Sequence, residues 1–268
     1  MVIIQLNPQK TKNRYLKVIK ESPILNTDNF RSIFGSLDKS SLKTDRKGHI
    51  RALEFVALKN MVFKIEKKTI FPYIYKISSN FYNSKNLFID SRFTIFTNSS
   101  ENIYLKKTIN PDKIIKKLIS HLGEKYVWGG NFANGINDLL KLYPPSKSLN
   151  KDLLDKWILK GIDCSGLLFE VTNGFTPRNT KDLLNYKNPV LIENLSLTQI
   201  SKIVKPLDLI VFKDHDVIIL DKNFAIESRE NFGVIKTPLI ERLEEIHKNK
   251  SPKNIYHSPN DYVIRRWI

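Results

Sequence analysis

The sequence lacks most of the features that mark a secreted or membrane-spanning protein. It has one cysteine in 268 residues, which excludes an intramolecular disulfide. It also has no run of about 18 apolar residues that would cross a bilayer. The first residues, MVIIQLNPQKTKNRY, contain no apolar segment of signal-peptide length. From these absences we expect a cytoplasmic protein without a membrane span.

Signals for a bound metal or cofactor are missing as well. The Asp and His residues show no tight metal-ligand spacing, and no glycine-rich phosphate loop occurs. We therefore expect neither a metal nor a cofactor.

Positive charge is abundant and unevenly placed. The net charge is +17, of which residues 1–110 contribute +12 (20 Lys and Arg less 8 Asp and Glu) and residues 111–268 contribute +5 (24 less 19). Such an excess suits nucleic acid, an anionic membrane or an anionic wall polymer. It also fits a general bias of the composition, because Lys, Asn and Ile are frequent throughout. A contact between the basic N-terminal part and an anionic polymer is therefore one of two open alternatives.

The pattern along the chain divides it into two parts. Residues 30–97 contain short apolar segments separated by polar turns, which is typical of a small β-barrel or sandwich. The triplet Asn110-Pro111-Asp112 then provides a helix N-cap, a proline at the first helical position and an acidic first turn. We predict a basic β domain over residues 1–105 and a second domain, of α+β class, over residues 106–268.

The only cysteine lies where a helix is expected to begin. Asp163 is a suitable N-cap, apolar residues at helical spacing follow Cys164, and Asn173-Gly174 is suited to ending the helix. Unpaired N–H groups and the helix dipole favour a thiolate in the first turn, as a nucleophile requires. The alternative is that Cys164 is a small buried core residue.

A catalytic cysteine needs a base from a rigid element, and His215 is the best candidate. The short apolar runs 208–212, 217–220 and 224–227 predict an antiparallel meander, and His215 stands at the start of its second strand. The other four histidines lie in the N-terminal part, on an amphipathic helix or in a Lys-rich segment. Glu227 falls on the next strand, where it would orient the imidazole if the two strands form a hairpin.

These residues occur in an order that resembles the NlpC family of bacterial cell-wall cysteine peptidases, which have a papain-like fold. The matching segments are Tyr126-Val-Trp-Gly-Gly130, Asp163-Cys-Ser-Gly-Leu167, Thr176-Pro-Arg178, Pro206-Leu-Asp-Leu-Ile-Val-Phe212, His215 with the strand 217–220, and Ala225-Ile-Glu-Ser228. The resemblance covers roughly residues 111–268. The family often carries bacterial SH3-like barrels in front of the peptidase, which implies an SH3-like fold for residues 1–105.

The resemblance implies a function and a set of catalytic residues. Cys164 would be the nucleophile, His215 the base, and Glu227 the third polar residue, a position where the family usually has His, Asn or Gln. Family members cleave wall peptides between the γ-carboxyl of D-glutamate and the diamino acid, and several act on murein fragments with a free N-terminal L-alanine. We therefore expect a thiol peptidase that hydrolyses such murein peptides through a thioester.

The resemblance also implies substrate-binding residues, each of which has a structural alternative. The candidates are Tyr126, Trp128, Asp163, Ser165, Arg178 and Thr180. Asp163 in particular would pair with the ammonium group of the substrate's L-alanine. Alternatively, Asp163 and Ser165 are only helix caps, the two aromatic residues belong to the core, and Arg178 is a structural ion-pair partner.

Two departures from the family pattern stand out. The 32 residues from 131 to 162 are a longer connection than usual, which predicts an insertion that borders the cleft as a lid or docking surface. Asp216 follows His215, where an apolar residue is typical. Two other functions stay open: an acyltransferase or deamidase on the same fold, and a non-catalytic wall- or nucleic-acid-binding protein.

Overall fold

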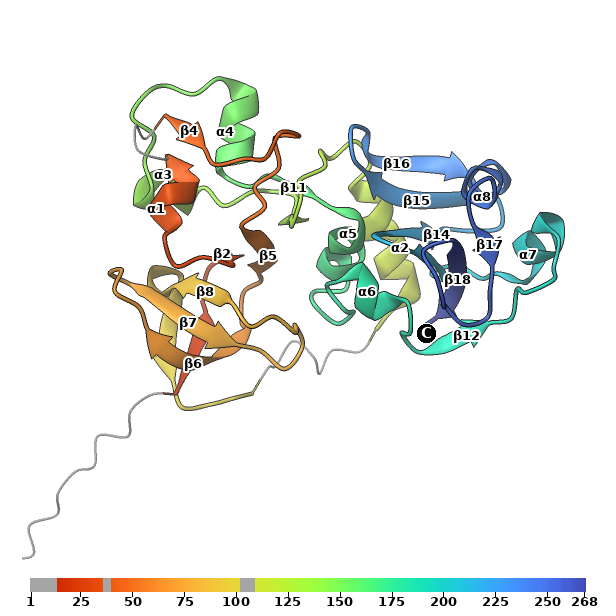
Figure 1. Cartoon of the computed structure of the whole chain (residues 1–268), viewed down its shortest axis with the longest axis horizontal. Coiled ribbons are helices and arrows are strands. Elements are labelled where there is room, and N and C mark those ends of the chain that lie inside the picture. Colours follow the sequence, from red (N-terminus) through yellow and green to blue (C-terminus); the bar gives the residue numbers. More distant parts are fainter. Residues whose placement is uncertain (1–13, 36–39, 102–108) are drawn as a thin grey trace, which may run out of the picture.

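The α+β class is confirmed by the computed structural model, which describes residues 14–35, 40–101 and 109–268. The N-terminal strands form one lobe, and helices α5 (Cys164–Val171) and α6 (Thr180–Leu183) stand on the side of a second sheet that faces this lobe (Figure 1). The predicted boundary at residues 105 and 106 lies outside the described residues. The N-cap expected at Asn110 is confirmed, because its side chain accepts from Lys113 N at 3.0 Å at the start of α2 (Pro111–Ser120).

The N-terminal lobe is built on a seven-stranded antiparallel sheet, as the short apolar segments predict. The strands are ordered β5-β2-β8-β7-β6-β1-β9. Their bounds are β1 (Tyr15–Val18), β2 (Ser22–Leu25), β5 (Leu53–Ala57), β6 (Val62–Lys68), β7 (Ile74–Ser78), β8 (Leu87–Asp90) and β9 (Thr94–Thr97), with a 3-10 turn at Ser91–Phe93. Aromatic residues such as Phe55 and Phe63 fill its core. The SH3-like assignment stays a prediction.

Residues 131–162 pack against this lobe, and none of them lines the pocket at Cys164. They form β10 (Asn131–Phe132), α3 (Asp138–Leu142), α4 (Lys151–Trp157) and β11 (Gly161–Ile162), and they lie beside α1 (Phe30–Ile33), β3 (Phe34–Gly35) and β4 (Ser41–Leu42). Trp157 is fully buried there and donates to Tyr143 O at 3.0 Å. The expectation of a lid over the cleft is therefore wrong, because most apolar side chains of the segment complete the N-terminal core. The alternative of a docking surface stays a prediction.

The C-terminal sheet is the predicted meander extended at both edges. Its order is β12-β18-β13-β14-β15-β16, with β17 paired to β18. The bounds are β12 (Asn188–Val190), β13 (Leu209–Phe212), β14 (His215–Ile219), β15 (Phe224–Arg229), β16 (Gly233–Pro238), β17 (Ser251–Pro252) and β18 (Asp261–Arg266), with helices α7 (Leu197–Ile203) and α8 (Leu239–His247). The strands β12 and β16 and the helix α7 were not predicted from the sequence. For α7 a local signal exists, because Ser196 and Gln199 form a capping box at its start.

Helices cover both faces of this sheet, and this arrangement decides where each residue of β14 points. Ile218 packs in one core with Leu167 of α5 and Leu118 of α2. Val217 and Ile219 pack in the other core with Leu243 of α8. Figure 1 shows α5 on the side of the sheet toward the N-terminal lobe and α8 on the far side. Successive residues of β14 therefore alternate between the α5 face and the α8 face.

Two hydrogen bonds between the Asn131 side chain and the Val56 backbone join the two lobes beside α5. Asn131 Nδ2 donates to Val56 O at 2.9 Å, and Asn131 Oδ1 accepts from Val56 N at 2.8 Å. Gly166 in α5 permits the close approach, since a Cβ atom there would lie 2.0 Å from Gly130 O. The N-terminal lobe is thereby held directly against the segment that precedes the cysteine helix.

Candidate active site

Cys164 occupies the first turn of α5, as the sequence predicts. Asp163 is the N-cap and accepts from Gly166 N at 2.7 Å, which satisfies one of the free donors at the helix start. The Cys164 side chain is buried, with Sγ 3.6 Å from Thr180 Oγ1 and 3.8 Å from Asp214 O. The helix start therefore places the thiol between α6 and the β13–β14 turn.

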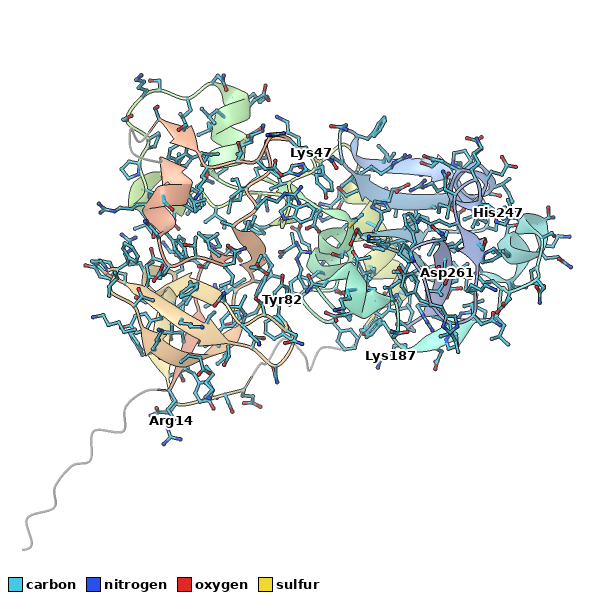
Figure 2. All side chains as sticks on the ribbon, viewed as in Figure 1. Arg14, Lys47, Tyr82, Lys187, His247 and Asp261 are labelled. Atoms are coloured by element: carbon cyan, nitrogen blue, oxygen red, sulfur yellow. The ribbon has the colours of Figure 1, made fainter. Side chains whose placement is uncertain are left out.

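A pocket of about 380 Å³ opens at this thiol and is built by both lobes. The N-terminal lobe contributes Arg51, Glu54 and Tyr82, and the C-terminal lobe contributes Tyr126, Trp128, Thr180 and Asp214. In Figure 2, Tyr82 is labelled at the edge of the N-terminal lobe that faces α6. The N-terminal lobe therefore forms one wall of the pocket.

Arg178 is the centre of a buried hydrogen-bond network beneath the pocket. Its Nη1 and Nη2 atoms donate to Asp163 Oδ1 and Oδ2 at 3.0 and 2.7 Å. The remaining N–H groups donate to Asn131 Oδ1, Ser165 Oγ and Gly130 O. A guanidinium group has five N–H donors, so Arg178 has none left for a substrate. Arg178 is therefore a structural residue, which agrees with the alternative that it is an ion-pair partner and not a substrate ligand.

Asp163 and Ser165 are occupied by the same network. Each oxygen of Asp163 accepts two bonds, from Gly166 N and Arg178 on one side and from Gly129 N and Arg178 on the other. Ser165 Oγ donates to Arg178 O at 2.6 Å. The expectation that Asp163 pairs with a substrate ammonium is wrong in this geometry, because its four acceptor positions are filled.

The remaining predicted substrate residues do line the pocket. Trp128 is 38% exposed, and the Arg51 guanidinium lies 3.9 Å above its ring. Burial and the charge of Asp163 raise the pKa of Tyr126, so its hydroxyl stays protonated. Thr180 contacts the thiol itself. These three side chains are placed to touch a bound molecule.

His215 lies on the α8 face of the sheet, away from Cys164. It shares the side of β14 with Val217 and Ile219, and it lines a separate pocket with Arg242 and Ile246. Its Nε2 atom is 2.5 Å from Glu227 Oε2, so the predicted hairpin contact between the two is confirmed. Glu227 also forms an ion pair with Arg242 at 2.6 Å. The structure therefore joins His215 and Glu227 to each other but does not bring either to the thiol.

Asp216 takes the position on the α5 face that the sequence reading gives to His215. It is 1% exposed, and among the described residues neither carboxyl oxygen has a cation or a backbone N–H as its partner. Burial raises the pKa of Asp216 to about 7. The nearby His215 and a hydrogen bond with the Cys164 thiol oppose this effect, and the charge of Asp163 reinforces it. The thiol of Cys164 and this carboxyl group are close enough to shift each other's pKa.

The thiolate expected at the helix start is contradicted by these surroundings. Burial raises the pKa of Cys164 well above its ordinary value, and the negative charges of Asp216 and Asp163 raise it further. Hydrogen bonds from Thr180 and from the Ser165 N–H act in the opposite direction but do not prevail. Cys164 is therefore a protonated thiol at neutral pH.

Sequence reasoning did not identify Glu54 as a site residue, and it noted Asp216 as the unusual residue after His215 without placing it at the thiol. The strand around Asp216 is apolar on both faces, so no alternation reveals which residue points toward α5. Glu54 comes from the other lobe, and only the tertiary fold brings it to the pocket. Within the described ranges, no group of three or more His, Cys, Asp or Glu side chains is arranged to hold a metal ion. None of the helices in those ranges is long and apolar enough to cross a membrane.

No family model and no curated protein matches this sequence. Some solved structures match this chain over part or most of its length. An NlpC/P60 family protein from Bacillus cereus is 18% identical with a TM-score of 0.37, and the match covers 95% of this chain but only 64% of that one. NlpC1 from Trichomonas vaginalis is 12% identical with a TM-score of 0.34, and 95% and 69% of the two chains are covered.

A third similar structure is RipD from Mycobacterium tuberculosis, which is described as a non-catalytic NlpC/p60 domain protein adapted to peptidoglycan binding. It is 16% identical with a TM-score of 0.35, and the match covers 59% of this chain and 98% of RipD. Since all of these TM-scores are below 0.5, the function is inferred below from the residues of the site.

Proposed function

We propose that this protein is a thiol hydrolase that cleaves a small peptide through a thioester on Cys164. The observation that carries the proposal is the position of Cys164 at the first turn of α5, with its thiol at a pocket walled by both lobes. The backbone N–H of Cys164 lies at the helix start, where no carbonyl of the helix reaches it. It is placed to stabilise the oxyanion formed when the thiol attacks a carbonyl.

The proposed substrate is a peptidoglycan-derived peptide, cleaved between the γ-carboxyl of D-glutamate and the diamino acid. This finer assignment rests on the resemblance of the sequence motifs around Tyr126, Cys164 and Arg178 to the NlpC peptidases. The size of the pocket supports a short peptide, because about 380 Å³ suits a small molecule.

The free amine of such a peptide finds its partner in Glu54 in this proposal. Glu54 Oε1 accepts from Asn26 Nδ2 at 3.0 Å, and Oε2 accepts from Tyr82 Oη at 2.7 Å. Each oxygen therefore keeps one acceptor position, whereas those of Asp163 are filled. An ammonium group held by Glu54 would form a charge-assisted hydrogen bond at the wall of the pocket.

Mass spectrometry of L-Ala-γ-D-Glu-diaminopimelate incubated with the protein tests the proposal. We expect release of L-Ala-D-Glu and diaminopimelate by the wild type and none by Cys164→Ala. Glu54→Gln should raise KM for the free-amine peptide and leave KM for its N-acetylated form unchanged. An intact peptide after long incubation with the wild type would refute hydrolysis, and transfer to an added amine would indicate the acyltransferase alternative.

A second candidate function is binding of the same peptide without cleavage. It is favoured by one observation, which is that His215 lies on the far face of the sheet from Cys164. Isothermal titration calorimetry distinguishes the two. A binding protein would give a stable complex, with the peptide recovered intact and with similar affinity for Cys164→Ala.

A further inference from the structure

The buried carboxyl group of Asp216 is the exception among the buried acidic residues of the described chain. Every other one has a direct partner: Asp90 with Arg92, Asp155 with Lys125, Asp163 with Arg178, Asp208 with Arg266, Glu227 with Arg242, and Asp261 with backbone N–H groups. Neither oxygen of Asp216 has a cation or a backbone N–H as its partner, and the neighbour that lowers its pKa through a hydrogen bond is the thiol of Cys164. An unpaired buried carboxylate costs folding free energy, so its retention points to a role in function.

The position of Asp216 on β14 fixes what it faces. Ile218 and Ile226 are paired across β14 and β15, and both pack in the core that contains α5. Two residues earlier on the same strand, Asp216 points to the same side, toward the start of α5 and the thiol of Cys164. His215, one residue earlier, points to α8.

We propose that Asp216 is the proton acceptor and donor for Cys164, in place of a histidine. This assignment rests on the proposed function and names the base of the same site. A general base works best when its pKa is near the operating pH, which burial achieves for this carboxyl group. The charged and titratable groups around it are Cys164 and Asp163 at the start of α5, and His215 and Glu227 from β14 and β15.

One carboxyl group is sufficient for all the proton transfers of the reaction. As the sulfur of Cys164 attacks the peptide carbonyl, its S–H proton moves to the Asp216 carboxylate and the carbonyl electrons form an oxyanion. Collapse breaks the C–N bond, and the leaving amine takes the proton from Asp216. Water then attacks the thioester and gives a proton to Asp216, and breakage of the C–S bond returns that proton to the sulfur.

Three variants test the assignment in the full-length protein. Asp216→Asn keeps the shape but cannot accept the proton, so we expect kcat to fall by about 10²- to 10⁴-fold. His215→Gln is the matched control on the neighbouring residue and should change kcat less than about threefold, since His215 faces α8. In the wild type, kcat/KM should rise with pH and level off above about pH 7, where Asp216 is ionised. Asp216→His places an imidazole beside the thiol and should restore a large part of the activity.

Alkylation of Cys164 by iodoacetamide gives an independent readout that a purely structural role would not produce. Removing the negative charge in Asp216→Asn should lower the thiol pKa, so alkylation should begin at lower pH while hydrolysis falls. Circular dichroism checks that the variants are folded, and Asp216→His supplies a second test if Asp216→Asn is not.

The outcomes separate the two proposals. Hydrolysis that survives in Asp216→Asn but is lost in His215→Gln would overturn the role of Asp216 and leave the proposed function intact. Absence of hydrolysis by the wild type, at the level of Cys164→Ala, would overturn the proposed function and with it the role of Asp216. Loss of hydrolysis in Asp216→Asn together with easier alkylation of Cys164 would support both.

Discussion

Arg178 donates to both carboxylate oxygens of Asp163, the residue that precedes Cys164, at 2.7 and 3.0 Å. The pair is almost completely buried, and Asp163 is at the same time the N-cap of the cysteine helix. The position of the thiol in the pocket therefore depends on an ion pair that has no spare capacity for a ligand.

Replacing Arg178 should reduce stability more than it changes substrate binding. Arg178→Met leaves Asp163 as an unpaired buried charge, so we expect the free energy of unfolding to fall by roughly 3–5 kcal/mol, measured in urea. Arg229→Met is the control, since its ion pair with Glu245 is partly exposed and should contribute at most about 1 kcal/mol. Unchanged stability with a raised KM would instead make Arg178 a substrate ligand.

The reactivity of Cys164 should resemble that of a buried thiol. Because burial and the charges of Asp216 and Asp163 raise its pKa, alkylation by iodoacetamide should be slow at pH 6–8 and accelerate only above the ordinary thiol range. The rate measured from pH 5 to 10, with unfolded protein as reference, checks this. Rapid alkylation at pH 6 would show a thiolate, and with it an imidazolium close to the sulfur.

Glu227 should act on stability and not on catalysis. Burial raises its pKa, but the bonds from His215 and Arg242 outweigh this effect and hold the pKa of Glu227 below its ordinary value. The stability that Glu227 contributes is therefore fully present at pH values above its pKa in the unfolded chain. It is lost as the pH falls through the lower pKa that Glu227 has in the folded protein. Glu227→Gln should lower the free energy of unfolding at pH 7 by roughly 3 kcal/mol and leave kcat unchanged. A lower kcat in a fully stable variant would return Glu227 to the catalytic set.

Glu170 should make the protein less stable as pH rises through neutrality. Its carboxylate accepts from Ala133 N, but burial raises its pKa from 4.5 to about 7. Between these two values the folded state binds more protons than the unfolded state, so the free energy of unfolding decreases with pH. Glu170→Gln should remove this slope and be more stable than the wild type at pH 8, by on the order of 3 kcal/mol at most. Thermal unfolding of both proteins from pH 4 to 8 measures it, and parallel curves would contradict it.

Local signals in the sequence were sufficient for the start of the cysteine helix and for the meander. Asp163 caps its helix through its own side chain, and the charged turns between the short apolar runs 208–212, 217–220 and 224–227 mark the ends of strands. Both depend on neighbours in the chain. These features are therefore readable without the tertiary fold.

The local sequence did not show to which face of the sheet His215 and Asp216 each point. The strand continues as Val217-Ile-Ile219, which is apolar on both sides because helices cover both faces of the sheet. A shift of one residue exchanges the two faces, and only the packing of Ile218 against α5 and Val217 against α8 settles it. The pKa of Cys164 was missed for a related reason, because it depends on burial and on a carboxyl group 52 positions later.

The segment 131–162 has a consequence for how the chain folds during synthesis. Trp157 and Leu159 belong to the same apolar cluster as Phe30 and Leu53, so residues about a hundred positions apart must meet to complete the N-terminal core. Domains generally fold in order as they leave the ribosome, the first before the second. Here the first lobe cannot finish before residue 159 has emerged, four residues ahead of Asp163. The N-terminal lobe therefore completes its core at nearly the same point of synthesis at which the start of the cysteine helix emerges.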